Sequence, residues 1–169
     1  AGMPVVILKA RDFGKTGYET PRELEADDAL KARIEAIRLE LGPTMNLGEV
    51  RDKTVPKITL IAPPKGGGLV STRTFIPHRV HEAIGVFGAV SVATACLLPG
   101  SVAHEVSELS AEPGTRSLDI EHPSGLFTVE VEIEHNGDRV RVMRSALLRT
   151  ARKLMQGTLF VPTSIWSGS

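Results

Sequence analysis

The 169-residue sequence contains a single cysteine, Cys96, and few aromatic residues: five Phe, one Tyr and one Trp. One cysteine excludes a disulfide framework and indicates a reducing compartment, so we expect a cytoplasmic protein. The scarcity of aromatics, with no basic patch around them, argues against a nucleic-acid-binding protein. Twenty basic residues balance twenty acidic ones, so the formal net charge is zero. The chain opens with Ala1-Gly2 and shows no signal peptide, and we interpret this opening as either an artificial boundary or an internal start.

The longest apolar run covers residues 83–98, where the only polar side chains are Ser91 and Thr94. The run is too long for one ordinary strand, so it predicts a helix over about residues 85–98. Pro99-Gly100 ends the run, which leaves it short of the roughly 20 residues that span a bilayer. We therefore expect a helix inside a globular domain and no membrane segment.

The predicted helix has no polar face, so we expect it to be buried on every side. Val90, Ala93 and Leu97 should be almost fully buried among strand residues. Cys96 lies within the same run. A thiol in apolar surroundings is inert, so we interpret Cys96 as a core residue and not as a nucleophile.

The start of this helix is a candidate anion site. Its first turn contains Gly85 and Gly88, and the sequence before it carries His78, Arg79 and His81. The first turn of a helix leaves about four backbone N–H groups without partners and holds roughly half a positive charge. Glycines there let a carboxylate or phosphate approach the backbone closely. Close packing of a crowded buried helix explains the glycines equally well, and both interpretations stay open here.

The rest of the chain predicts one amphipathic helix and many short strands. A capping box, Thr20-Pro-Arg-Glu23, precedes apolar residues at helical spacing that end at Gly42-Pro43, with a break near Asp27-Asp28. The predicted strands cover residues 4–10, 57–63, 68–76, 101–109, 117–121, 127–134, 139–144 and 158–162. Asn136-Gly137 predicts a hairpin turn at residues 135–138. Together these elements predict a single α+β domain over residues 1–169, with a sheet around the apolar helix and an amphipathic outer helix.

Two further turns carry polar or glycine residues. Glu121-His-Pro-Ser-Gly125 could hold His122 and Ser124 in a set direction, although a plain β-turn is the alternative. The glycine-rich segment 64–68 lacks the Gly-Lys-Ser/Thr ending of a phosphate loop, so we predict a flexible hairpin loop. The pair His78-x-x-His81 lacks a third ligand at motif spacing, and we predict no metal site.

Several sequence words occur along the chain in the order of a known family. They are Gly2-Met-Pro-Val-Val6, Gly14-x-x-Gly-Tyr-Glu19, Leu24-Glu-Ala-Asp27, Arg33-Ile-Glu-Ala-Ile-Arg38, Phe75-Ile-Pro-His78, Gly85-Val-Phe-Gly-Ala-Val-Ser-Val-Ala-Thr-Ala-Cys-Leu97 and Glu121-His-Pro-Ser-Gly125. The chain resembles, from residue 1 to about Pro162, the second half of the PrpF-like isomerases. The words favour the oxalomesaconate branch of gallate degradation over the methylaconitate isomerases.

The resemblance implies a diaminopimelate-epimerase-like fold: two similar halves, each a mostly antiparallel sheet rolled around a central buried helix, with the active site between them. It implies proton transfer along an allylic or keto–enol system in a tricarboxylate, with no metal and no organic cofactor. The lysine and cysteine thought to act as acid and base belong to the first half. We therefore expect no catalytic residue in this chain, which would supply substrate-carboxylate binding and have no activity alone.

The residues and the resemblance together nominate ten substrate-binding positions: Met3, Pro4, His78, His81, Gly85, Phe87, Gly88, His122, Ser124 and Gly125. We expect residues 85–88 and 122–125 to face one cleft. The expected partners are a small tricarboxylate and the first half of the enzyme, with a homodimer as a further possibility, and neither nucleic acid nor a membrane. A stand-alone carboxylate-binding module without turnover remains the alternative.

Overall fold

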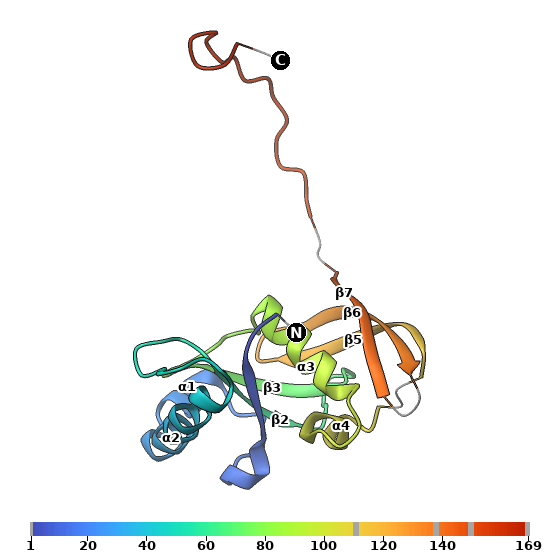
Figure 1. Cartoon of the computed structure of the whole chain (residues 1–169). Coiled ribbons are helices and arrows are strands. Elements are labelled where there is room, and N and C mark those ends of the chain that lie inside the picture. Colours follow the sequence, from blue (N-terminus) through green and yellow to red (C-terminus); the bar gives the residue numbers. More distant parts are fainter. Residues whose placement is uncertain (1, 110–111, 137–138, 149–150, 168–169) are drawn as a thin grey trace.

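One mixed sheet, curled into a half-barrel around a helix, organises the chain (Figure 1). The computed structural model describes residues 2–109, 112–136, 139–148 and 151–167. The strands follow the order β1-β2-β3-β5-β6-β7, and β4 pairs with β3. The pairs β1–β2 and β3–β5 are parallel and the others antiparallel. The strands are β1 (Val5–Lys9), β2 (Lys57–Ala62), β3 (Val70–Ile76), β4 (Arg79–Val80), β5 (Gly114–His122), β6 (Gly125–Asn136) and β7 (Arg139–Leu147).

The helices lie on both faces of the sheet. They are the 3₁₀ helix η1 (Ala10–Phe13), α1 (Pro21–Glu25), α2 (Asp28–Thr44), α3 (Val86–Cys96) and α4 (Val102–Ser107). Thr20 and Glu23 form the predicted capping box at α1, and the Asp27 side chain caps α2. The predicted break near Asp27-Asp28 is therefore confirmed. In contrast, α2 continues through Pro43, beyond the predicted end. Among the described residues, no helix is both long and apolar enough to cross a bilayer.

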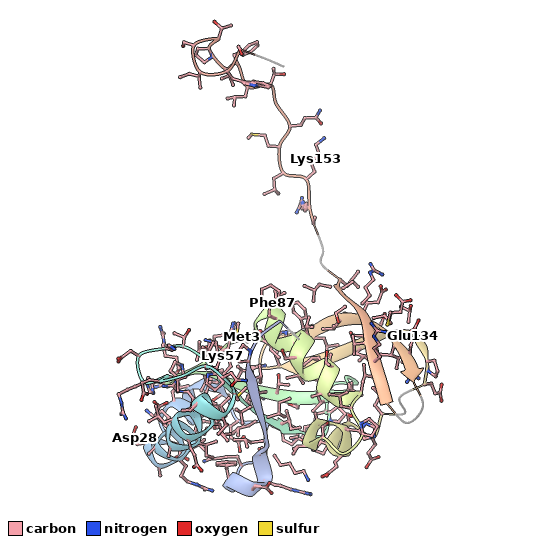
Figure 2. The ribbon with its side chains drawn as sticks, in the orientation of Figure 1. Met3, Asp28, Lys57, Phe87, Glu134 and Lys153 are labelled. Carbon is pink, nitrogen blue, oxygen red and sulfur yellow. The ribbon has the colours of Figure 1, made fainter. Side chains whose placement is uncertain are left out.

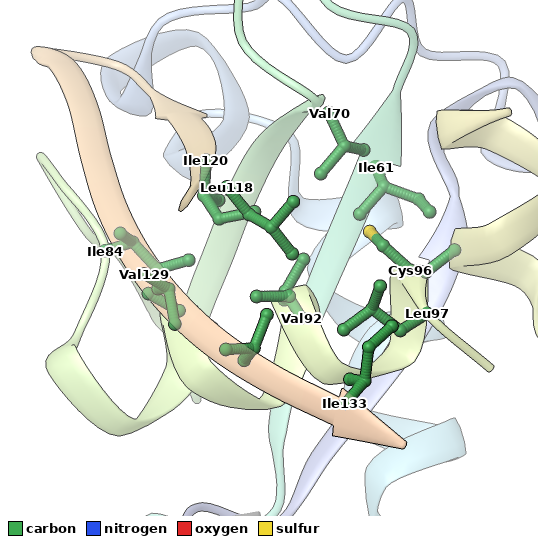
Figure 3. Packing of buried hydrophobic residues seen from close by; sticks show 14 residues of the cluster. Ile61, Val70, Ile84, Val92, Cys96, Leu97, Leu118, Ile120, Val129 and Ile133 are labelled. Carbon is green, nitrogen blue, oxygen red and sulfur yellow. The ribbon is translucent and has the colours of Figure 1, made fainter. Parts of the chain in front are cut away.

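The helix α3 packs into the curve of the sheet, as Figure 3 shows for Val92, Cys96 and Leu97. Ala93 and Leu97 are fully buried, as predicted. The prediction that α3 is buried on every side is wrong, because Val90 is only partly buried and Phe87 is 57% exposed. The physical reason is that the sheet surrounds α3 on one side only. The α+β architecture with a mostly antiparallel sheet around this helix is confirmed.

A second core lies between the other face of β1–β3 and the helices α1 and α2. Side chains alternate along a strand, so Ile58 and Leu60 of β2 pack against this second core while Ile61 packs with α3. Leu24 of α1 and Ile34 of α2 cover the second core. The predicted outer helix is therefore α2, and it has its own apolar contact surface.

Two predicted strands are wrong. Residues 101–109 contain the helix α4, because the Ser101 side chain accepts a hydrogen bond from the His104 amide and caps it. Residues 158–162 belong to an extended segment without helix or strand that leads away from the sheet, where Figure 2 marks Lys153. The predicted hairpin at residues 135–138 agrees with the pairing of Asn136 with Arg139, while residues 137 and 138 lie outside the described part.

Arg38 of α2 is fully buried and connects the helix to the loop that follows it. Its guanidinium donates to the Glu35 carboxylate at 2.7 and 2.8 Å. It also donates to the carbonyl oxygens of Val50, Lys53 and Val55 at 2.9, 3.0 and 3.1 Å. Buried polar groups are costly unless they are hydrogen-bonded. One guanidinium therefore satisfies three loop carbonyls and holds residues 50–55 against α2.

Replacing Arg38 with Met should lower the free energy of unfolding by about 3 kcal/mol, because the change leaves buried carbonyl groups without donors. The measurement is urea denaturation, with Arg22→Met on the exposed surface of α1 as the matched control. Equal midpoints for the two variants would contradict the assignment of Arg38 as a structural hub.

Replacing Ala93 with Asp should prevent folding, because a carboxylate would be buried without a partner in the core around α3. The next residue, Thr94, is only partly buried and serves as the control. Thr94→Asp should stay folded and lose no more than about 1 kcal/mol. Circular dichroism and urea denaturation distinguish the two variants, and a folded Ala93→Asp protein would refute the proposed packing.

Candidate functional site

The first turn of α3 offers backbone amides that no side chain caps among the described residues. Gly85 is the N-cap residue, and a Cβ built on it would have no heavy atom within 4 Å. The amide of Ala89 already donates to the Gly85 carbonyl oxygen at 2.8 Å. The amides of Val86, Phe87 and Gly88 precede it, where helix geometry provides no intrahelical acceptor. This turn can therefore accept an anion.

The start of the chain lies against the same end of α3. The Ser91 hydroxyl donates to the Met3 carbonyl oxygen at 2.8 Å. The Phe87 ring packs over Gly2, whose Cβ position would be 2.6 Å from the ring. Figure 2 labels Met3 and Phe87 at this place. Pro4 continues into β1, and its carbonyl oxygen accepts from the Lys57 amide at 2.9 Å. The structure therefore brings the predicted residues Met3 and Phe87 together beside the first turn of α3.

The predicted turn between β5 and β6 reaches the loop before α3. Ser124 donates its hydroxyl proton to the Glu82 carbonyl oxygen at 2.7 Å. The Ser124 amide lies 3.3 Å from His122 Nδ1, and Gly125 has a φ of 147°, which L side chains rarely adopt. The turn is therefore hydrogen-bonded to Glu82, which lies three residues before Gly85. Because the hydroxyl proton is engaged within the protein, Ser124 connects the turn to this loop.

His122 is half-buried in this turn. Burial lowers the pKa of His122 below its usual value, and the charges of His81 and Arg73 add to this effect. A hydrogen bond with the Leu126 backbone opposes it. A histidine whose pKa is depressed in this way is mostly neutral at pH 7. His122 therefore carries little positive charge at pH 7, and its ring is already hydrogen-bonded within the protein.

His81 lines a shallow hollow of about 470 Å³ beside the turn. Its Nδ1 accepts a hydrogen bond from the Ala83 amide at 3.0 Å, so a neutral ring carries its proton on Nε2. Arg79 and Glu82 also line the hollow. Another hollow, of about 220 Å³, lies at the other end of β1 and contains the Lys9–Glu105 ion pair. The second hollow is lined by none of the nominated residues.

The remaining nominated histidine, His78, is exposed in the turn between β3 and β4. Its charge contributes to lowering the pKa of Glu35 on α2, after the larger effect of Arg38. His78 is therefore within electrostatic reach of Glu35, and no described contact joins it to the first turn of α3. No group of three or more potential metal-ligating side chains occurs in the part of the chain that the structure describes.

Comparisons with known proteins agree with this fold and with the family that the sequence resembles. The family model described as "PrpF protein" matches residues 1–162. The chain belongs to the PrpF family. The diaminopimelate-epimerase-like fold is consistent with this membership.

Three relatives are similar to this chain over nearly its whole length. The chain is 54% identical to 4-oxalomesaconate tautomerase of Pseudomonas putida over 99% of its length and 45% of the relative's. It is 56% identical to (4E)-oxalomesaconate Delta-isomerase of Novosphingobium sp. over 95% of its length and 44% of the relative's. It is 30% identical to 2-methyl-aconitate isomerase of Shewanella oneidensis over 96% of its length and 44% of the relative's. The chain thus spans about half the length of these relatives, all of which are isomerases.

A solved structure agrees with the fold. The crystal structure of methylitaconate-delta-isomerase matches with a TM-score of 0.76 at 21% identity, over 99% of this chain and 47% of the other. At this level of identity the match supports the fold of this PrpF-family chain and nothing finer.

One polar feature near the site was missed by sequence reasoning. The carboxylate of Glu121, beside His122, accepts hydrogen bonds from the amides of Lys65, Gly66 and Gly68 in the β2–β3 loop. The loop joins antiparallel strands, as predicted, but its amides are engaged by this carboxylate. Glycines in series, each able to turn an amide inward, were the available signal.

Burial alone would raise the pKa of Glu121. The hydrogen bonds from Lys65, Gly68 and Gly66, together with the charge of Arg73, outweigh burial and lower the pKa below its usual value. Glu121 is therefore ionised at neutral pH although it is only 7% exposed.

Cys96 lies in the core. Burial raises the pKa of its thiol to about 11, and this effect outweighs a hydrogen bond with Ser107 that lowers the pKa. At pH 8 only about one thiol in a thousand is then ionised, and the thiolate is the reactive form. The native chain should therefore fail to react with a disulfide reagent such as DTNB over minutes, while the chain unfolded in guanidinium should release one equivalent. Rapid labelling of the native chain would show that Cys96 is accessible.

Proposed function

We propose that this chain is the second half of a cofactor-independent isomerase that moves a proton along an allylic or keto–enol system in 4-oxalomesaconate. The observation that carries the proposal is the contrast in identity: 54% and 56% to the two oxalomesaconate enzymes against 30% to a 2-methyl-aconitate isomerase. The proposal includes a role in gallate degradation in the cytoplasm. A methylaconitate or aconitate isomerase is the alternative within the family.

In this proposal the chain binds substrate carboxylates. Removing a proton beside a carbonyl group needs a base within reach and an electrostatic trap for the enolate that forms. The uncapped amides of Val86, Phe87 and Gly88 are suited to hold one carboxylate or the developing oxyanion. Their positive potential comes from fixed backbone dipoles, which do not titrate. The turn at residues 122–125 borders this position through the Ser124–Glu82 hydrogen bond.

Of the two histidines in this region, His81 provides a directed hydrogen bond through Nε2. His122 is mostly neutral at pH 7, for the reason given above, and His81 keeps its proton on Nε2 when it is neutral. Arg79 lines the same hollow as His81 and adds a permanent charge. A tricarboxylate carries up to three negative charges, so a formally neutral chain must gather its donors locally. In this proposal the local group of donors is formed by residues 79–88 and 122–125.

The proton-transfer groups are proposed to lie in the other half of the protein. Cys96 is buried with a raised pKa, and the Lys65 ammonium lies 3.7 Å from the centre of the Tyr18 ring in a cation–π contact. Neither group is near the first turn of α3 by any described contact. We therefore assign no catalytic acid or base to this chain.

The other half would cover the open side of α3. Phe87 and Leu98 are 57% and 39% exposed, and Leu126 at the start of β6 is 50% exposed. Exposed apolar side chains at these positions support the proposed interface with the other half, where they would be covered. A homodimer that covers the same surface is the second possibility.

The test of the function compares the full-length protein with the 169-residue chain. The full-length protein should convert 4-oxalomesaconate faster than 2-methylaconitate, and the chain alone should convert neither, as followed by ultraviolet absorbance and NMR. Preference for 2-methylaconitate would favour the alternative isomerase. A chain that turns over substrate by itself would refute the assignment of the acid and base to the other half.

Gly85→Asp in the full-length protein separates binding from stability. Aspartate is a favoured N-cap residue, so the melting temperature should stay the same or rise. The new carboxylate would occupy the first-turn amides and compete with the substrate, so KM should rise about tenfold or more. Gly85→Ala is the matched control, since open space surrounds that Cβ position. A Gly85→Asp enzyme with unchanged KM would exclude the first turn of α3 as a carboxylate site.

A further inference from the structure

The β2–β3 loop wraps the carboxylate of Glu121. The Lys65 amide donates to both carboxylate oxygens, at 2.9 and 3.1 Å. The amides of Gly66 and Gly68 donate to Oε1 at 2.5 and 2.9 Å. These three amides and the carboxylate are called the Glu121 cradle below. Four charge-assisted hydrogen bonds on one side chain define a single position for it.

The loop backbone packs so closely against β5 that position 68 has no space for a side chain. A Cβ on Gly68 would lie 2.6 Å from Glu121 Cγ and 2.8 Å from the Asp119 carbonyl oxygen. The Leu69 amide donates to that same carbonyl oxygen at 2.7 Å. The loop backbone therefore lies directly against β5, and only glycine permits this approach at position 68.

The main chain of Glu121 is held as well. The buried Thr72 side chain donates to the Glu121 carbonyl oxygen at 2.6 Å. The parallel pairing of β3 with β5 comprises only Val70 with Ile120 and Ser71 with Glu121, so it ends at this residue. The next residue, His122, starts the turn that reaches Glu82. Glu121 is thus the last residue of β5 that pairs with β3, and His122, which pairs only with Gly125 of β6, ends the strand at the candidate site.

We propose that Glu121 is a positioning residue whose carboxylate, held in the cradle, sets the direction in which His122 and the 122–125 turn meet the substrate. The role rests on the proposed function, because it assumes that this turn borders the substrate. Glu121 itself points into the β2–β3 loop and acts only through the turn that follows it.

The experiment compares Glu121→Gln with Glu19→Gln in the full-length protein. Glutamine keeps the shape of Glu121 but turns an N–H₂ group toward amide donors, so the cradle loses acceptors. Glu19 is the matched control, because its carboxylate also accepts from backbone amides, those of Thr16 and Gly17, in a different loop. Glu121→Gln should raise KM about tenfold while kcat stays within about threefold, and Glu19→Gln should change neither.

Hydrogen–deuterium exchange supplies a readout that does not depend on turnover. The amides of His122 and of residues 124–126 should exchange faster in Glu121→Gln and at the wild-type rate in Glu19→Gln. Unchanged exchange in Glu121→Gln would overturn the anchoring, and unchanged KM in an active enzyme would overturn the positioning role. A wild-type protein that turns over none of the tricarboxylates would refute the proposed function, while the exchange data would still decide whether the cradle anchors the turn.

A second variant covers the case in which Glu121→Gln does not fold. Thr72→Val removes the hydrogen bond to the Glu121 carbonyl oxygen and keeps the shape of the buried side chain. It should produce the same changes in KM and in the exchange of the same amides, at a smaller size. Wild-type behaviour of Thr72→Val in both measurements would overturn the proposal.

Discussion

The packing of α3 into the curved sheet is the interaction on which the rest of the structure depends. An apolar helix without a polar face must lose its water-exposed surface to something, and burial of such surface is the largest favourable term in folding. Strands β5 and β6 supply Leu118, Val129 and Ile133 for this purpose. The first three strands take part in both cores, because Ile61 faces α3 while Ile58 and Leu60 face α1 and α2. The curvature of the sheet is therefore matched to one helix.

This packing also determines where polar chemistry can occur. One face of α3 is committed to the core, and the backbone amides of the helix are free of intrahelical partners only in its first turn. Gly2 and Met3 lie against that end of α3, and the Ser124–Glu82 hydrogen bond ties the 122–125 turn to the loop that precedes it. Most polar groups around the turn already have partners within the protein, as the Ser124 hydroxyl does. Among the described residues, no side chain caps the amides at the start of α3, and such uncapped amides are the groups that the proposed carboxylate site uses.

Local signals predicted much of this architecture. The capping box at Thr20, the period-two strands and the apolar run each depend on neighbouring residues, and the structure reproduces them. At Ser101 two local signals compete. The apolar residues of this segment predict a strand, but the capping Ser101 side chain starts the six-residue helix α4. The Glu121 cradle could not be predicted, because it joins residues 53 to 56 positions apart. The exposure of Phe87 could not be predicted, because α3 is apolar on all sides. The sequence alone therefore does not distinguish the side that packs on the sheet from the side that the incomplete barrel leaves exposed.

The open barrel has a mechanical consequence. β1 and β7 lie at the two ends of the strand order, and in the part of the chain that the structure describes no ladder pairs them with each other. The helix α3 contacts both edges, so side-chain packing on one helix completes a ring that hydrogen bonds leave open. Packed surfaces slide by small steps more readily than strands exchange their hydrogen bonds. Packing on α3 is thus the connection between the two edge strands in the described structure, and the first turn of α3 belongs to that same helix. A force applied at this turn reaches both ends of the sheet through a single helix.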